Sequence, residues 1–271
     1  MPIIAEFCQS HNGSTDTLRE MVYHAAESGA QFAKIQSFFA DDLTEEWKTD
    51  YERLKPLELS WADHKNFVQW CKADGIIPMT SVYTTRYAQE VYNAGFKYVK
   101  IGSAQASNEK LIKTYIMAGF KVIVSTGGHR IQDISKTGPI AGVLHCVSKY
   151  PFPPEEADLI RMLELKKYFH NVPIGYSDHS DPMHAQWDMA SKVAIYLGAQ
   201  YVERHFTILA RNETKDGPVS INPEQLRELC RWDHLKQEQR LVELPSLGLL
   251  SCPKSIPEYD LIKKYNKRWK A

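Results

Sequence analysis

The most constraining feature of this sequence is a regular alternation of short β-rich runs with segments of helical periodicity. Eight such runs follow one another, and only the link after the fifth is short and weakly helical. The alternation is typical of βαβ units, which build a parallel sheet. An open, doubly wound sheet shares the pattern, but eight units without a GxGxxG motif favour closure. The sequence therefore predicts an α/β protein with a (β/α)8 TIM barrel, and its 271 residues are close to the usual length of about 250.

The expected elements are as follows. We expect strands over residues 3–8, 32–37, 76–82, 98–103, 121–126, 141–146, 173–178 and 200–207. We expect helices over residues 15–28, 60–74, 84–94, 108–118, 155–168, 182–197 and 223–236, with Ser60 as an N-cap.

The expected barrel domain covers residues 1–242, and a basic and aromatic C-terminal tail covers residues 243–271. The tail is interpreted as a solvated segment or short docking helix, with contact to nucleic acid or an anionic surface as the alternative. Lys plus Arg and Asp plus Glu both total 33, so no global charge indicates a nucleic-acid or membrane partner. No apolar run approaches the ~20 residues of a membrane span.

The cysteines and the N-terminus indicate a compartment. Five cysteines form no CxxC pair and no metal-ligand spacing, and their number is odd, which fits a reducing environment. The first residues lack the basic and apolar regions of a signal peptide. We therefore expect a cytoplasmic protein.

Polar residues gather near the carboxyl ends of nearly all the expected strands. In a TIM barrel the catalytic groups lie at that end, where the βα loops begin. A polar residue inside an apolar strand is costly to bury unless it is paired, so a whole set of them predicts a wet pocket. The set includes Glu6, Lys34, Gln36, Thr80, Lys100, Ser103, Gln105, Ser125, Thr126, His145, Ser148, Tyr150, Ser177, Asp178, His179, Glu203, Arg204 and His205.

His179 and His205 occupy matching positions on the seventh and eighth expected strands. Because consecutive strands are neighbours in a barrel, the two imidazoles can converge. Two imidazoles with oxygen ligands suit a borderline divalent ion such as Mn²⁺, Zn²⁺ or Fe²⁺. Either histidine alone would be interpreted as a core residue, and the matching positions favour a metal site. The remaining histidines interpreted as structural or surface residues are His24, His64, His129, His145, His170, His184 and His234.

Lys34 and Lys100 are expected to point into the same open end of the barrel, from the second and fourth strands. Hydroxyls of Ser103, Ser125 and Ser177, with the glycine turn after Ser125, add further donors. Two ammonium groups among hydroxyls form a phosphate or carboxylate pocket.

The alternative is a set of buried Lys–Glu pairs inside the barrel. Glu6 and Glu203 are too few to neutralise Lys34, Lys100, Arg204 and a divalent cation. A dianionic substrate would supply the missing negative charge.

Seven segments carry a family resemblance. They are 5–13 (AEFCQSHNG), 33–36 (AKIQ), 100–103 (KIGS), 124–127 (VSTG), 144–151 (LHCVSKYP), 175–180 (GYSDHS) and 203–207 (ERHFT). In this order and combination they resemble the sialic acid (N-acetylneuraminate) synthase family. The resemblance covers about residues 3 to 230 and is highly specific.

Members of that family condense phosphoenolpyruvate with an N-acylated hexose aldehyde, giving a 2-keto-3-deoxy sugar acid and phosphate, with Mn²⁺, Mg²⁺ or Co²⁺ as cofactor. Carried onto this chain, the resemblance implies that His179 and His205 bind the metal. It implies that phosphoenolpyruvate is held by Lys34, Thr80, Lys100, Ser103, Ser125 and Ser177. The catalytic residues near the sugar and the reacting atoms would be Glu6, Gln36 and Tyr150.

Three departures from the family affect the sugar side or the lid. Typical members carry a C-terminal antifreeze-like domain that closes over the partner's active site, whereas a short tail follows the barrel here. The usual Gly-Pro-Asp-His after strand eight is Gly-Pro-Val-Ser at 217–220, with Asp216 in front of it. The common Thr-Pro-Phe after strand three is Thr-Ser-Val at 80–82. Expected partners are the two small-molecule substrates, a second copy in a homodimer, and a separate antifreeze-like lid chain.

Two other functions stay open from the sequence. A Schiff-base aldolase would use Lys100 or Lys34 as its nucleophile. A barrel without its lid would serve as a subunit or binding partner in nonulosonic acid biosynthesis.

Overall fold

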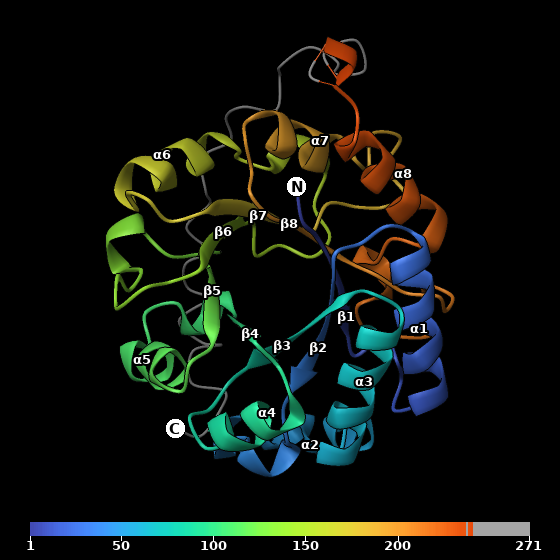
Figure 1. Ribbon diagram of the computed structural model, residues 1–271, viewed down its shortest axis with the longest axis vertical. Coiled ribbons are helices and arrows are strands. Elements are labelled where there is room, and N and C mark those ends of the chain that lie inside the picture. Colours follow the sequence, from blue (N-terminus) through green and yellow to red (C-terminus); the bar gives the residue numbers. More distant parts are fainter. Residues whose placement is uncertain (237, 241–271) are drawn as a thin grey trace.

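The computed structural model describes residues 1–236 and 238–240. Eight parallel strands close into one barrel in chain order, with β1 hydrogen-bonded to β2 on one side and to β8 on the other. Figure 1 shows the strands at the centre and the helices around them. The prediction of a (β/α)8 barrel is confirmed, while the predicted boundary at residue 242 and the tail 243–271 lie outside the described residues.

The elements have the following bounds. The strands are β1 (Ile3–Cys8), β2 (Phe32–Ser37), β3 (Ile77–Val82), β4 (Tyr98–Ile101), β5 (Lys121–Ser125), β6 (Gly142–Cys146), β7 (Ile174–Asp178) and β8 (Val202–His205). The α-helices are α1 (Thr15–Glu27), α2 (Tyr51–Leu54), α3 (Trp61–Ala73), α4 (Ala88–Ala94), α5 (Glu109–Met117), α6 (Ile160–Tyr168), α7 (Met189–Tyr196) and α8 (Pro223–Asp233).

Local sequence signals explain most of these bounds. Ser60 caps α3 as predicted, since its hydroxyl accepts the Asp63 N–H (3.2 Å) and the Asp63 carboxylate accepts the Ser60 N–H (2.8 Å). After β5 the chain forms only a 3₁₀ turn at Ile131–Asp133, as the weak helical pattern indicated. Strands β4 and β8 end two residues before the predicted positions, at Ile101 and His205.

Three helices begin later than predicted. The chain before α7 turns instead, because the Asp181 carboxylate accepts the Met183 N–H (2.9 Å). The start of α6 is delayed to Ile160 because Asp158 has a positive φ of 48°, which a helix cannot contain. The segment before α4 is instead anchored to its surroundings, with the carbonyl of Thr84 accepting a hydrogen bond from a tyrosine hydroxyl (3.1 Å).

Side chains inside the barrel form an apolar layer and, above it, a polar layer. The apolar layer contains Ile4, Phe32, Met79, Ile123 and Leu144. Two residues further along each strand the side chain again points inward, because side chains alternate between the faces of a strand. These positions hold Glu6, Lys34, Ser81, Ser125 and Cys146. The polar layer therefore lies at the carboxyl end of the barrel.

On the outer face of β7 and β8, Asp178 and Arg204 form a fully buried ion pair, with 2.7 Å between Oδ2 and Nη1. Burial favours the neutral acid, but the guanidinium outweighs it and lowers the pKa of Asp178. This corrects the charge balance expected from the sequence, which counted Arg204 among the cations of the pocket. Arg204 points away from the pocket and has its own partner.

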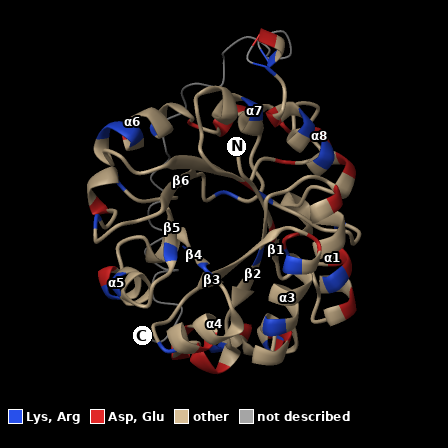
Figure 2. Cartoon of the chain, in the orientation of Figure 1, with Lys and Arg blue, Asp and Glu red and all other residues tan. Residues whose placement is uncertain are grey.

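Charged side chains are otherwise concentrated on the helices around the barrel (Figure 2). Among the described residues, no helix is long and apolar enough to cross a membrane.

Replacing Arg204 with Met should lower the free energy of unfolding by about 3–5 kcal/mol, because Asp178 would remain buried without its partner. Urea unfolding measures the change. The control is Arg130→Met, which breaks an exposed pair with Asp133 and should cost no more than about 1 kcal/mol. Equal effects of the two substitutions would contradict the assignment of a buried, stabilising pair.

Candidate active site

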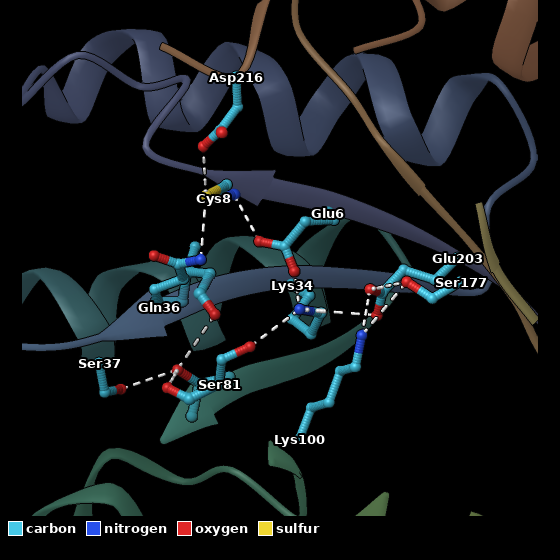
Figure 3. A network of polar contacts seen from close by, with 12 residues as sticks. Glu6, Cys8, Lys34, Gln36, Ser37, Ser81, Lys100, Ser177, Glu203 and Asp216 are labelled. Atoms are coloured by element: carbon cyan, nitrogen blue, oxygen red, sulfur yellow. Dashed lines mark hydrogen bonds and ion pairs between the residues drawn. The ribbon is translucent and has the colours of Figure 1, made fainter. Parts of the chain in front are cut away.

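A network of buried charges fills the polar layer of the barrel. The Lys34 ammonium forms ion pairs with Glu6 and, at 3.5 Å, with Glu203, and it donates to Ser81 Oγ (2.9 Å). Lys100 forms an ion pair with Glu203. Ser177 donates to the same carboxylate (2.9 Å). Figure 3 shows these contacts joining side chains from β1, β2, β3, β4, β7 and β8.

The alternative of buried Lys–Glu pairs therefore describes this state of the site, with two ammonium groups matched by two carboxylates. Burial lowers the pKa of Lys34 to about 7, although Glu203 acts in the opposite direction. Burial alone would raise the pKa of Glu203, but Lys100 and Lys34 outweigh it and lower that pKa. Glu203 is therefore ionised at neutral pH, while Lys34 is poised to gain or lose a proton.

A cradle of donors lies at the ends of β4 and β5. The Gly127 N–H donates to Ser103 Oγ (3.0 Å). A Cβ added to Gly127 would lie 2.8 Å from the Cys146 sulfur and 2.9 Å from Ser103 Oγ, so only glycine fits there. The buried hydroxyl oxygen of Ser125 has no hydrogen-bond partner among the described residues. A buried hydroxyl without a partner is costly, which fits a position that a ligand completes.

Thr80 does not join this group. Its hydroxyl is hydrogen-bonded to Ser37 Oγ (2.7 Å), which in turn contacts His64 Nε2 (2.9 Å) on the helix side of the sheet. The neighbouring Ser81 points inward and binds Lys34. The predicted role of Thr80 remains a prediction, while the contacts favour Ser81, because adjacent residues of a strand face opposite sides. The inward position of Lys34 was the signal that could have identified Ser81, since Lys34 pairs with Met79 and Ser81 lies two residues further on the same face.

The predicted histidine pair is brought together, with 5.4 Å between the ring centroids of His179 and His205. The His179 Nδ1 atom lies 2.8 Å from the Val147 carbonyl, to which it can donate, and its Nε2 atom lies 2.9 Å from the Tyr150 hydroxyl. Burial lowers the pKa of His179 to about 4 and that of His205 well below its usual value. Both rings are therefore neutral at neutral pH, with a nitrogen lone pair available to a metal ion.

Two further residues, Cys8 and Asp216, lie beside the histidine pair, although the sequence did not indicate them as ligands. Cys8 Sγ, a carboxylate oxygen of Asp216 and a ring nitrogen of His205 all lie within 4.8 Å of one another. The Cys8 thiol contacts Asp216 Oδ2 at 2.7 Å, and the Gln36 amide donates to the sulfur at 2.9 Å. The spacing of cysteines gave no signal, because the three residues lie far apart in the chain. The position of Cys8 at the end of the first strand was the available clue.

Residues 21–239 match the model of the NeuB family. The chain belongs to the NeuB family. An N,N'-diacetyllegionaminic acid synthase of Legionella pneumophila is 31% identical over 84% of this chain and 70% of its own. The human N-acetylneuraminate-9-phosphate synthase is 27% identical over 92% of this chain and 73% of its own. Among solved structures, the spore coat polysaccharide biosynthesis protein SpsE of Bacillus subtilis has a TM-score of 0.79 at 28% identity, covering 93% of this chain and 73% of that one.

These NeuB relatives confirm the family that the sequence motifs resembled.

Gly127→Ala should abolish anion binding at the cradle. Inorganic phosphate at about tenfold its Kd should raise the melting temperature of the wild type by a few degrees, since it binds only the folded state. The added methyl group would occupy the cradle, and the rise should disappear. Gly102→Ala is the matched control, because nothing lies within 4 Å of its added Cβ. An unchanged rise in Gly127→Ala would show that the anion binds elsewhere.

Proposed function

We propose that this chain is a phosphoenolpyruvate-dependent synthase of the nonulosonic acid type. It would condense phosphoenolpyruvate with an N-acylhexosamine-type aldehyde, giving a 2-keto-3-deoxy sugar acid and inorganic phosphate. The observation that supports this most is that two buried lysines, a cradle of hydrogen-bond donors and a histidine pair all lie at one end of the barrel. The names of the relatives, which are synthases of legionaminic acid and of N-acetylneuraminate 9-phosphate, agree with it.

Phosphoenolpyruvate would lie between the lysines and the cradle. Lys34, Lys100 and Ser177 already contact one another through Glu203, and their donors converge on one space. Ser103 and Ser125 would hold the other end of the anion. We substitute Ser81 for Thr80 in this set, because Ser81 is the residue that contacts Lys34.

The residues of the site also fit the expected metal, since His179 is anchored through Nδ1 and His205 has no hydrogen-bond partner for its buried Nδ1 among the described residues. A divalent ion such as Mn²⁺, Mg²⁺ or Co²⁺ bound there would supply a Lewis acid for the aldehyde oxygen. Tyr150 lies beside His179 and Gln36 lies beside Cys8, so both would lie near the acceptor aldehyde in the proposed complex.

In this reaction the residues of the chain would transfer protons and stabilise negative charge. C3 of phosphoenolpyruvate forms a bond to the aldehyde carbon, water adds to C2, and the C2–O bond to phosphate then breaks. Glu6 would accept the proton of that water, since its carboxylate lies in the polar layer beside Lys34. Lys34 would hold the negative charge of the substrate throughout.

The proposal predicts that pure protein releases phosphate from phosphoenolpyruvate only with a divalent metal and a suitable hexosamine aldehyde. A panel of aldehydes, a phosphate assay and the product mass test this. His179→Ala should reduce phosphate release at least about 100-fold, because it removes a metal ligand. The exposed His170→Ala serves as control and should keep the wild-type rate. Wild-type release in His179→Ala would contradict the metal's role.

One observation favours a second function. A lysine whose pKa is about 7, such as Lys34, has the property that a Schiff-base aldolase requires of its nucleophile. That function predicts a covalent adduct between Lys34 and pyruvate after borohydride reduction, and full activity in EDTA. The synthase predicts no adduct and loss of activity in EDTA.

The pKa of Lys34 also gives a pH dependence. The anion binds the ammonium form, so kcat/KM for phosphoenolpyruvate should fall as pH rises above about 7, approaching tenfold per pH unit. Lys34→Arg stays charged throughout this range, so its profile should lack this decline. A wild-type profile that stays flat from about pH 7 to about pH 9, or the same decline in Lys34→Arg, would contradict the assignment.

A further inference from the structure

We propose that the metal site of this chain has four protein ligands, with the thiolate of Cys8 and the carboxylate of Asp216 added to His179 and His205. The inference rests on the proposed function, because it concerns the metal which that function requires. It goes further by assigning two ligands of different chemistry and, through them, the class of metal bound.

The distances suit one ion. Ligand atoms held tetrahedrally at about 2.0–2.3 Å lie about 3.3–3.8 Å from one another, and an ion in such a site would expand to five ligands to accept the aldehyde oxygen. The ligand atoms of Cys8, His205 and Asp216 lie within 4.8 Å of one another, so small rotations of the side chains bring them to this spacing. Two imidazoles on one tetrahedral ion have ring centroids about 5 Å apart, and those of His179 and His205 are 5.4 Å apart.

The surroundings of His205 indicate that this residue binds a metal and does not merely pack in the core. The residue is 6% exposed, and its Nδ1 atom has no hydrogen-bond partner among the described residues. A buried polar atom of this kind normally has a partner. The His179 ring is oriented by its contact with the Val147 carbonyl, and the Cys8 side chain is oriented by the Gln36 amide. Such outer contacts are typical of groups that bind metals.

The backbone brings Cys8 to the site in an unusual conformation. The pairing of β1 with β2 shifts register between Glu6 and Cys8, and Cys8 has a φ of 47°, which non-glycine residues rarely adopt. Strain of this kind is kept where the surrounding structure requires it. Here it directs the sulfur toward Asp216 (Figure 3).

Asp216 reaches the site because its loop returns to β8. The Ile221 N–H donates to the carbonyl of His205 (2.8 Å), and the Thr207 N–H donates to the carbonyl of Ile221 (3.0 Å). Within the loop, a Cβ on Gly217 would lie 2.7 Å from the carbonyl carbon of Arg211, so the tight turn after Asp216 requires glycine. An oxygen of the Asp216 carboxylate is therefore held within 4.8 Å of a ring nitrogen of His205, the residue that ends the strand.

The ligand set determines the preference for metals. A thiolate and two imidazoles favour Co²⁺, Zn²⁺ or Fe²⁺ over Mg²⁺, which prefers oxygen ligands. The thiolate and carboxylate also balance the two positive charges of the ion, while the adjacent Lys34, Lys100, Glu6 and Glu203 balance one another.

The test is the spectrum and affinity of the Co²⁺ form of the whole chain. We expect a thiolate-to-cobalt charge-transfer band in the near ultraviolet. Cys8→Ser should lose the band and bind Co²⁺ at least about tenfold more weakly, and Asp216→Asn should keep the band with a similar loss of affinity. Cys71→Ala removes a buried thiol of α3 outside the site and should change neither quantity.

The absence of the band in the wild type would by itself overturn the inference. The test therefore does not depend on whether the Cys8→Ser protein folds. Co²⁺ affinity of folded Cys8→Ser within twofold of the wild type would also overturn it. Failure of the proposed function looks different, since the band would then be present while no aldehyde supports phosphate release.

Discussion

Backbone hydrogen bonds between β1 and β8 close the barrel, and the arrangement of the site depends on them. Their register sets Glu6 opposite His205 and Ile4 opposite Glu203. The Phe206 N–H donates to the Glu6 carbonyl (2.8 Å), so the first and last strands are joined at the level of the polar layer. Residues about 200 positions apart in the chain thereby become neighbours, and Cys8 meets His205 and Asp216.

Inside this closed wall, the charges of the site form one connected system. Lys34 contacts carboxylates from β1 and β8, and Lys100 reaches Glu203 across the barrel from β4. A ligand that binds one ammonium group therefore alters the balance around the other. Because burial lowers the pKa of Lys34 to about 7, the network can take up the charge of an anion by taking up a proton.

The sequence was sufficient to predict the barrel and the half of the site that lies on strand ends. Eight repeats of one pattern leave few folds, and in this fold the carboxyl ends of neighbouring strands meet, which is why His179 and His205 could be paired. The differences between expectation and structure concern side-chain direction. Thr80 and Ser81 differ by one position, and so do Glu203 and Arg204, yet each pair divides between the two faces of a strand.

Cys8 and Asp216 could not be found by spacing for a different reason. Their meeting requires a register shift at the end of β1 and a loop that folds back onto β8, and neither has a clear mark in the sequence. The alternation of polar and apolar residues describes regular strands, whereas these two residues lie where regularity ends.

The buried pair of Asp178 and Arg204 has a consequence for how a metal could be acquired. These residues directly precede His179 and His205, and they join β7 to β8 from the outer face of the barrel. The two strands that lead to the histidines are thus fixed to each other by contacts that involve no metal. A metal bound between the histidines would therefore not be needed to hold these strands together, and the barrel would fold without it.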